Sequence, residues 1–346
     1  MKSKKNRSCF IICWFGSFPD YFPVWLQTVK YNQNFDFLIF TDNKSINYNF
    51  PKNVKVSYLT LSQFKDQAEK CLSEKCSVQR PYRICDYRPM FGKIFTNQLY
   101  NYDFWGYCDL DLIFGNIEAF VNQDTLNTYD AIFNGGHFTL IRNVEKMNNL
   151  FKESGSAFNY RTVIKHDAVF AFDEITGIQQ IAKQHKIKAK YLIPYVDADV
   201  KHRQIISVLD KNNPDNQCFY WENGELYRVK DDSYDMKYQN LTYIHLQKRP
   251  IKLKSNIKNL KRAFWITPTG YEEKNYMGKP NLKDVKLKNP FLGKKIMERE
   301  SRHYNWKKIK EILKRNPYQI YVRLVQAKNG INRNQGSVGE NAWKEY

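Results

Sequence analysis

Short apolar runs, separated by polar or Gly/Pro-containing segments, organise the first 250 residues of the chain. Runs of buried-strand type, or with period-two alternation, predict strands over residues 10–15, 35–40, 54–61, 104–108, 131–134, 138–141, 191–196 and 241–246. Apolar residues at three- and four-residue spacing predict helices over residues 25–31, 62–72, 86–100, 144–151 and 175–185. Asn223-Gly224 predicts a tight hairpin turn between strands at 218–221 and 225–229. This alternation predicts an α/β fold, a layered domain with a mixed central sheet and with active groups at the carboxyl ends of its strands.

Composition and charge divide the chain into two regions. With 346 residues, of which 42% are hydrophobic and 16% aromatic, the chain can bury a large core, which excludes a mainly disordered protein. Residues 251–346 carry 23 Lys or Arg against 8 Asp or Glu, whereas residues 1–250 are nearly balanced. We therefore expect a catalytic domain over residues 1–250 and a basic, partly helical C-terminal extension over 251–346.

Neither a membrane-spanning helix nor a cleaved signal peptide is expected. The apolar stretch at 9–15 is far shorter than the roughly 20 residues that a spanning helix needs, and no small-residue cleavage site follows it. The seven cysteines include no C-x-x-C pair and lie mostly in apolar runs, which indicates reduced core thiols. These features predict a cytoplasmic protein.

An acidic pair interrupts an otherwise apolar segment at Asp109-Leu110-Asp111. With 20 aspartates in the chain, about one D-x-D triplet is expected by chance, so the triplet alone does not indicate a metal site. The residues around the triplet have to distinguish a metal site from a chance match. Burying carboxylates is costly without a cation, and alternate residues of an extended segment point the same way. The pair is therefore interpreted as a site for Mg²⁺ or Mn²⁺, with a structural strand end as the alternative.

A second D-x-D triplet, Asp197-Ala198-Asp199, follows another apolar run. Its neighbours at 200–203 are polar, so ordinary solvation accounts for its carboxylates. It is the weaker candidate for a metal site, and a solvated strand end is the favoured interpretation.

Several segments carry a resemblance to a known family. They are YRICDYRPMFGK at 82–93, YDFWGYCDLD at 102–111, GHFTLIRN at 136–143, FDE at 172–174 and YIHLQK at 243–248. In this combination and order they resemble the GT-A glycosyltransferases, and they are particularly similar to bacterial enzymes of capsule and lipopolysaccharide gene clusters. The likeness covers roughly residues 8–250.

The resemblance implies a GT-A-like fold and a nucleotide-diphosphate sugar donor, with UDP as the usual nucleotide of this fold. Mn²⁺ or Mg²⁺ would be held by Asp109 and Asp111 and would stabilise the charge that develops on the leaving diphosphate. His245 stands where a late histidine completes the metal site in many such enzymes, although a hydrogen-bonded structural histidine is the alternative. Lys248 would contact a phosphate.

Further donor contacts follow from the same resemblance. Trp14 and Phe15 would stack on the nucleotide base or pack in the core, and Asp42 ends the second strand beside them. Asp86, Arg88 and Lys93 lie near the start of the helix before the metal motif. The two basic residues would face the diphosphate or sugar, unless this is simply a solvated helix end.

Asp173 and Glu174 are the candidates for acid/base chemistry on the acceptor. An inverting transfer needs a carboxylate within hydrogen-bond reach of the acceptor hydroxyl. Either residue can instead cap the helix that begins near Ile175. Gly135-Gly136-His137 would line the acceptor side or form a plain strand turn.

The basic extension predicts a membrane-surface contact. Trp306, Ile309, Ile312 and Leu313 alternate with five basic residues at 307–315, as in a helix lying on an anionic membrane. A lipid-linked acceptor would require this location, on the inner face of the plasma membrane. The alternative is a solvated helix packed on the catalytic domain, and the polar end at 329–346 predicts disorder.

Two other functional classes compete with this prediction. The net charge of +20 is typical of nucleic-acid-binding proteins, but no signature of a known nucleic-acid-binding motif is present, so no nucleic-acid partner is expected. A sugar nucleotidyltransferase would use the same acidic pair, but the first strand is not followed by a glycine-rich phosphate loop. We expect a metal-dependent glycosyltransferase that acts on a growing surface glycan or a lipid-linked acceptor.

Overall fold

The computed structural model describes most of the chain. The described residues are 5–45, 47–191, 193–210, 213–232, 235–247, 249, 251–253, 260–313 and 317–328.

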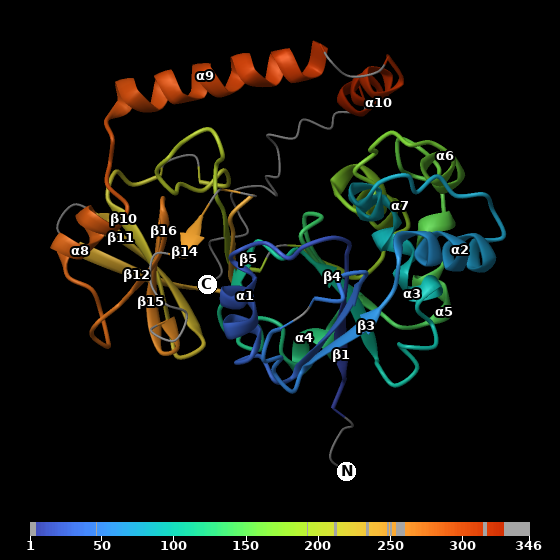
Figure 1. The fold of residues 1–346 in the computed structure, drawn as a ribbon, viewed down its shortest axis with the longest axis horizontal. Coiled ribbons are helices and arrows are strands. Elements are labelled where there is room, and N and C mark those ends of the chain that lie inside the picture. The colour runs from blue at the N-terminus through green and yellow to red at the C-terminus, as the bar shows by residue number, and fades with distance from the viewer. Residues whose placement is uncertain are drawn as a thin grey trace.

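A seven-stranded mixed sheet forms the centre of the molecule (Figure 1). Its order is β3 (Val54–Tyr58), β2 (Phe35–Thr41), β1 (Ser8–Trp14), β4 (Phe104–Cys108), β7 (Phe138–Arg142), β6 (Ala131–Asn134) and β8 (Ala189–Tyr191). The strands from β3 to β4 are parallel, whereas β7 is antiparallel to both β4 and β6. The α/β class and the mixed sheet predicted from the sequence are therefore confirmed.

Helices cover both faces of this sheet, because alternate residues of its strands point to opposite sides. Cys9 and Ile11 of β1 belong to one hydrophobic cluster, whereas Phe10 and Ile12 belong to another. The helices of the first cluster include α2 (Leu61–Leu72), α3 (Phe91–Ile94), α5 (Glu145–Asn148), α6 (Tyr160–Lys165), α7 (Gln180–Gln184) and α10 (Pro317–Lys328), which contributes Val322. The second cluster includes α1 (Phe22–Val29) and α4 (Gln123–Thr128).

A second, six-stranded sheet lies beside the first (Figure 1). Its order is β12 (Asp235–Leu241), β11 (Glu225–Asp232), β10 (Gln217–Glu222), β15 (Ala263–Thr267), β16 (Gly270–Glu273) and β14 (Lys252–Leu253), and α8 (Leu282–Lys288) packs on it. The predicted hairpin is confirmed, with left-handed φ angles of 49° at Asn223 and 94° at Gly224. β15 pairs with β10, so residues assigned from sequence to a separate extension share a sheet with residues 217–241.

Three short strands join the two large sheets. They are β5 (Leu112–Phe114), β13 (Tyr243–His245) and β9 (Tyr195–Asp197), with β13 in the middle. Ile113, Val196 and Ile244 share a hydrophobic cluster with residues of the six-stranded sheet, and the Trp221 indole N–H donates to the Phe114 carbonyl at 2.9 Å. This small sheet brings together segments from three distant parts of the chain.

Some predicted elements are broken in the structure. The helix predicted over residues 86–100 is wrong: a 3₁₀ segment η1 (Pro81–Met90) precedes the single turn of α3. Pro89 has no N–H to donate, and the Thr96 hydroxyl donates to the carbonyls of Gly92 and Lys93 at the end of α3. The helix predicted over 144–151 is likewise split, into α5 and the 3₁₀ turn η2 (Leu150–Lys152).

Two predicted strands are also divided between sheets. The predicted strand 191–196 divides between β8 and β9, and the predicted strand 241–246 divides between β12 and β13. Helix α2 begins one residue earlier than predicted, because the side chain of Thr60 caps it. The helix predicted over 175–185 is present as η3 (Ile175–Gln179) and α7, with non-helical backbone at Gly177.

The C-terminal helices are α9 (Lys294–Leu313) and α10 (Pro317–Lys328), and the end at 329–346 lies outside the described residues. None of the helices in the described ranges has the length and apolar character needed to cross a bilayer. All seven cysteines are free thiols, each buried or half-buried, as predicted.

Candidate functional site

The carboxyl end of β4 presents the acidic pair. Asp109 follows the last residue of β4, and Asp111 immediately precedes β5, so both lie in a short link between two sheets. The backbone holds this link on both sides: the Asp109 N–H donates to the His137 carbonyl at 3.1 Å, and the Asp111 carbonyl accepts from the Leu246 N–H at 3.0 Å. The Asp109 side chain is 27% exposed and that of Asp111 is buried. An ordered, partly open acidic pair results.

His245 lies against this pair because β13 runs between β5 and β9. In the register of these strands, His245 is opposite Leu112 on one side and Asp197 on the other. Its Nε2 lies 3.5 Å from an Asp111 oxygen and 4.0 Å from an Asp109 oxygen. Burial opposes protonation of the imidazole, but the charges of Asp111 and Asp197 outweigh it and hold the pKa of His245 well above its usual value.

Asp109, Asp111 and His245 form a set that can hold a metal ion. One ligand atom from each lies within 4.8 Å of the others. Two carboxylate oxygens and one imidazole nitrogen suit Mn²⁺ and also accept Mg²⁺. The structure thus brings together the three residues predicted from sequence as metal ligands.

Asp197 is a member of this cluster that the sequence analysis assigned to a solvated strand end. One of its oxygens accepts from His245 Nδ1 at 2.8 Å and from the Gln247 amide at 2.6 Å. Asp199, by contrast, accepts from the backbone N–H of Lys201 at 2.9 Å. The two carboxylates of the triplet therefore differ, and only the register of β9 with β13 distinguishes them.

His137 adds a second histidine to the cluster. Its ring lies 4.3 Å from that of His245, and Nδ1 is 3.2 Å from the Tyr243 hydroxyl. Burial, helped by the neighbouring His245, lowers the pKa of His137 to about 4. His137, Asp197 and His245 form an overlapping set with ligand atoms within 4.8 Å of one another. From the sequence, Gly135-Gly136-His137 was expected to line the acceptor side or to form a plain strand turn, and His137 was not predicted as a member of the metal cluster.

Arg88 supplies a fixed positive charge beside the acidic pair. Its guanidinium forms an ion pair with Asp109, lies 3.1 Å from an Asp173 oxygen and donates to the Gly136 carbonyl at 2.8 Å. Arg88, which was predicted to face the diphosphate or sugar, therefore contacts Asp109 of the D-x-D motif directly. It also joins β4, the turn after β6 and the segment that carries Asp173.

Asp173 and Glu174 flank the Gly136 backbone. Asp173 is buried, which raises the pKa of its carboxyl well above its usual value despite the nearby Arg88. Glu174 is half-buried, and a Cβ added at Gly136 would lie 2.6 Å from Glu174 Cγ. Gly136 therefore leaves room for both side chains, of which Asp173 lies beside the Arg88 guanidinium.

Asp86 and Lys93 lie away from the acidic pair. Asp86 is fully buried and forms an ion pair with Arg83, and its oxygens accept from the backbone N–H groups of Phe170 at 3.0 Å and Phe172 at 2.8 Å. Asp86 thus positions the segment that carries Asp173. Lys93 lies 3.3 Å from Glu145. Lys248 falls outside the described residues.

The loop after β1 is joined to the end of β2. Asp42 accepts from the Gly16 N–H at 2.7 Å. The half-buried Trp14 donates from its indole to the Ser17 carbonyl at 2.9 Å and stacks on Phe18. Phe15 packs in the core. The structure therefore brings Trp14 and Asp42 to one loop cluster but places Phe15 inside.

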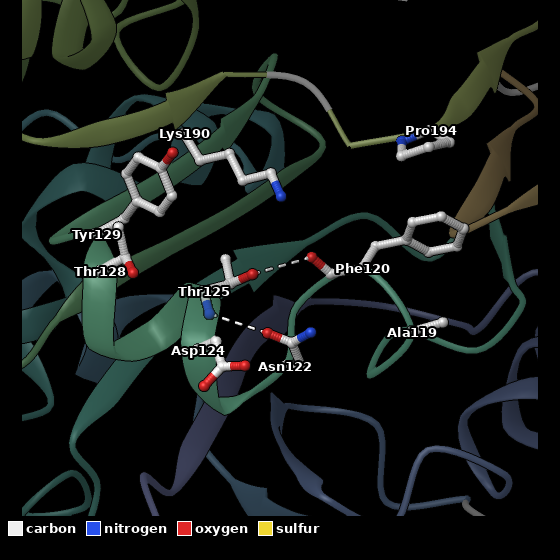
Figure 2. Close-up of a pocket in the computed structure, with 9 residues that line it drawn as sticks. All are labelled: Ala119, Phe120, Asn122, Asp124, Thr125, Thr128, Tyr129, Lys190 and Pro194. Atoms are coloured by element: carbon white, nitrogen blue, oxygen red, sulfur yellow. Dashed lines mark hydrogen bonds between the residues drawn. The ribbon is translucent and has the colours of Figure 1, made fainter. Parts of the chain in front are cut away.

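A separate hollow lies at the start of β6, away from its Gly135 end. Figure 2 shows its lining, which includes Asn122 at the start of α4, Asp124 within α4, Tyr129 before β6, and Lys190 of β8. Its lining offers a single carboxylate and no histidine or cysteine. This hollow therefore lacks the donor set of the Asp109 cluster.

Comparison with known proteins identifies a family. The chain belongs to a family of unknown function, DUF6625, which matches residues 10–275. Apart from the first two residues of β1, this region includes both large sheets and every residue of the cluster described above, and it ends before α8. A search of curated proteins gives no significant match.

Proposed function

We propose that this member of the DUF6625 family is a metal-dependent glycosyltransferase with a GT-A-type fold. The donor is a nucleotide-diphosphate sugar, with UDP as the preferred nucleotide. The sheet topology supports this proposal. The four parallel strands from β3 to β4 end at the edge where ligands bind in α/β sheets, and the acidic pair follows β4 at that edge.

The observation that carries the proposal is the convergence of Asp109, Asp111 and His245. Asp109 and Asp111 come from the link after β4 and His245 comes from β13, and their ligand atoms lie within 4.8 Å of one another beside a cationic Arg88. Hard carboxylate oxygens with one imidazole fit Mn²⁺ or Mg²⁺. Such an ion, when bound, supplies Lewis-acid stabilisation of the charge on a leaving diphosphate.

The surrounding residues provide the rest of a donor site. Arg88 places a guanidinium beside Asp109 and is suited to a phosphate or sugar oxygen. The loop tied by Asp42 offers the indole of Trp14 as a stacking face for a nucleobase. These groups orient the donor with its diphosphate toward the acidic pair.

Glu174 is the better of the two candidate bases for the acceptor. Asp173 is buried and paired with Arg88, so it is suited to holding that guanidinium in place. Glu174 is half-buried next to Gly136 and can approach an acceptor hydroxyl. The acceptor in this proposal is a surface glycan or lipid-linked saccharide of the capsule or lipopolysaccharide type.

Thermal shift and product analysis with a panel of nucleotide sugars test the proposal. A donor that binds the native protein raises its melting temperature, and the rise should require Mn²⁺. The donor that raises the melting temperature should also be turned over slowly, with release of its nucleoside diphosphate. Retention of RNA or DNA without any nucleotide-sugar response would contradict the proposal, and turnover of a sugar phosphate with a nucleoside triphosphate would indicate a nucleotidyltransferase.

A further inference from the structure

Helix α9 has two different faces. Met297, Glu300, Ser301, Tyr304 and Lys308 are partly buried at three- and four-residue spacing, so they form the face turned toward the rest of the protein. Glu300 lies 3.3 Å from the Arg203 guanidinium, and the Ser301 hydroxyl lies 3.3 Å from His202 Nε2. The inner face is therefore polar and makes specific contacts.

The opposite face is exposed, basic and partly apolar. It consists of Lys295, Arg299, Arg302, Trp306 and Ile309, spaced by four or three residues. Trp306 is 65% exposed and Ile309 is 47% exposed. We call these five residues the outer face of α9.

Acidic residues are placed so that this outer face stays positive. The helix contains seven Lys or Arg residues and three Glu residues. Glu300 lies on the inner face, and Glu311 lies 3.0 Å from Lys308. Glu298 flanks the outer face, which still carries three cations in line with an exposed indole.

The contacts of α9 and α10 place both helices on loops that lead to the candidate site. The inner face of α9 contacts residues 202–203, a few residues after Asp197. On α10, Gln319 exchanges hydrogen bonds of 2.8 and 3.0 Å with the Val169 backbone, shortly before Asp173. Figure 1 shows α9 along one outer edge of the molecule.

We propose that the outer face of α9 docks on an anionic lipid bilayer surface. Lys and Arg near such a surface are attracted by its negative potential, and an exposed Trp prefers the headgroup region. An apolar protein partner would not favour three cations on the same face as the indole. The bilayer would thereby lie on the side of the protein reached by the loops from Asp197 and Asp173. The inference does not depend on the reaction catalysed.

Vesicle sedimentation with the full chain tests the inference, without metal or nucleotide sugar. The protein should sediment with vesicles that contain phosphatidylglycerol and remain free with pure phosphatidylcholine. The double substitution Arg299→Glu/Arg302→Glu should lower the partition coefficient about tenfold or more. Lys283→Glu/Lys286→Glu on α8 is the matched control, because it makes the same charge change at exposed positions and should retain binding.

The outcomes separate local docking from general charge attraction. Equal loss of binding by both double variants would overturn the inference, as would retention of RNA with no vesicle binding by the unaltered chain. Trp306→Ala should also reduce partitioning, and this loss should persist when salt screens the charges. Circular dichroism checks that each variant keeps its helices. Donor turnover is measured separately from vesicle binding. A chain that does not bind vesicles can therefore still be a glycosyltransferase, and a chain without donor turnover can still dock on a bilayer.

Discussion

Asp197 accepts a hydrogen bond from Nδ1 of His245 at 2.8 Å, which leaves Nε2 of the same ring facing Asp111. The parallel register of β9 and β13 places these two residues side by side. A carboxylate behind a metal-binding histidine fixes the ring and raises its basicity. Asp197 is therefore placed to position His245 for the proposed ion.

Replacing Asp197 by Asn should weaken Mn²⁺ binding about 10- to 100-fold, because the imidazole loses a charged partner that orients it. Electron paramagnetic resonance of free Mn²⁺ measures the affinity directly. Asp199→Asn is the matched control, since its carboxylate bonds to the Lys201 backbone, and it should bind Mn²⁺ as the unaltered chain does. Equal affinity in both variants would show that Asp197 has no part in the site.

Asp111→Asn should abolish Mn²⁺-dependent turnover of the donor while the fold is kept. The change preserves the size of the side chain but removes the charge that a divalent cation needs. Turnover and melting temperature are measured on the same samples. Asp124→Asn, in the hollow of Figure 2, is the control that should remain active. Full activity of Asp111→Asn with saturating metal would exclude the D-x-D assignment.

Binding of Mn²⁺ should release about one proton near neutral pH. The pKa of His245 is raised by Asp111 and Asp197, so its imidazole is protonated in the free protein and must lose this proton to ligate. Affinity should therefore rise with pH below the pKa of His245 and level off above it. Calorimetric titrations in two buffers of different ionisation enthalpy count the protons, and identical heats in both would contradict this prediction.

Arg83→Met should lower the free energy of unfolding by about 3–5 kcal/mol, because it leaves the Asp86 carboxylate buried without its cation. Urea denaturation measures the change. Lys308→Ala, which breaks a pair with Glu311 in which both side chains are nearly half exposed, should cost no more than about 1 kcal/mol.

The double variant Arg83→Met/Asp86→Asn distinguishes charge from packing. It removes the uncompensated carboxylate and should therefore be more stable than Arg83→Met alone. A double variant at least as unstable as Arg83→Met would indicate that lost packing, rather than the unpaired charge, dominates.

Hydrophobic patterning by itself determined the α/β class, the main strands of the central sheet, the hairpin at Asn223-Gly224 and the acidic pair as the point of interest. These depend on local spacing, which the chain carries along its length. Hydrophobic patterning gave a wrong prediction at η1 and α3, where Pro89 and the Thr96 hydroxyl interrupt the helix that was expected over residues 86–100.

Tertiary structure alone decided how the site is assembled. The apolar runs before Asp197 and around His245 read as single strands, but each is divided between sheets. Only the pairing of β5, β13 and β9 places His245 between Asp197 on one side and Leu112, the residue after Asp111, on the other. The physical reason is that strand register is set by contacts between distant segments, which local spacing does not encode.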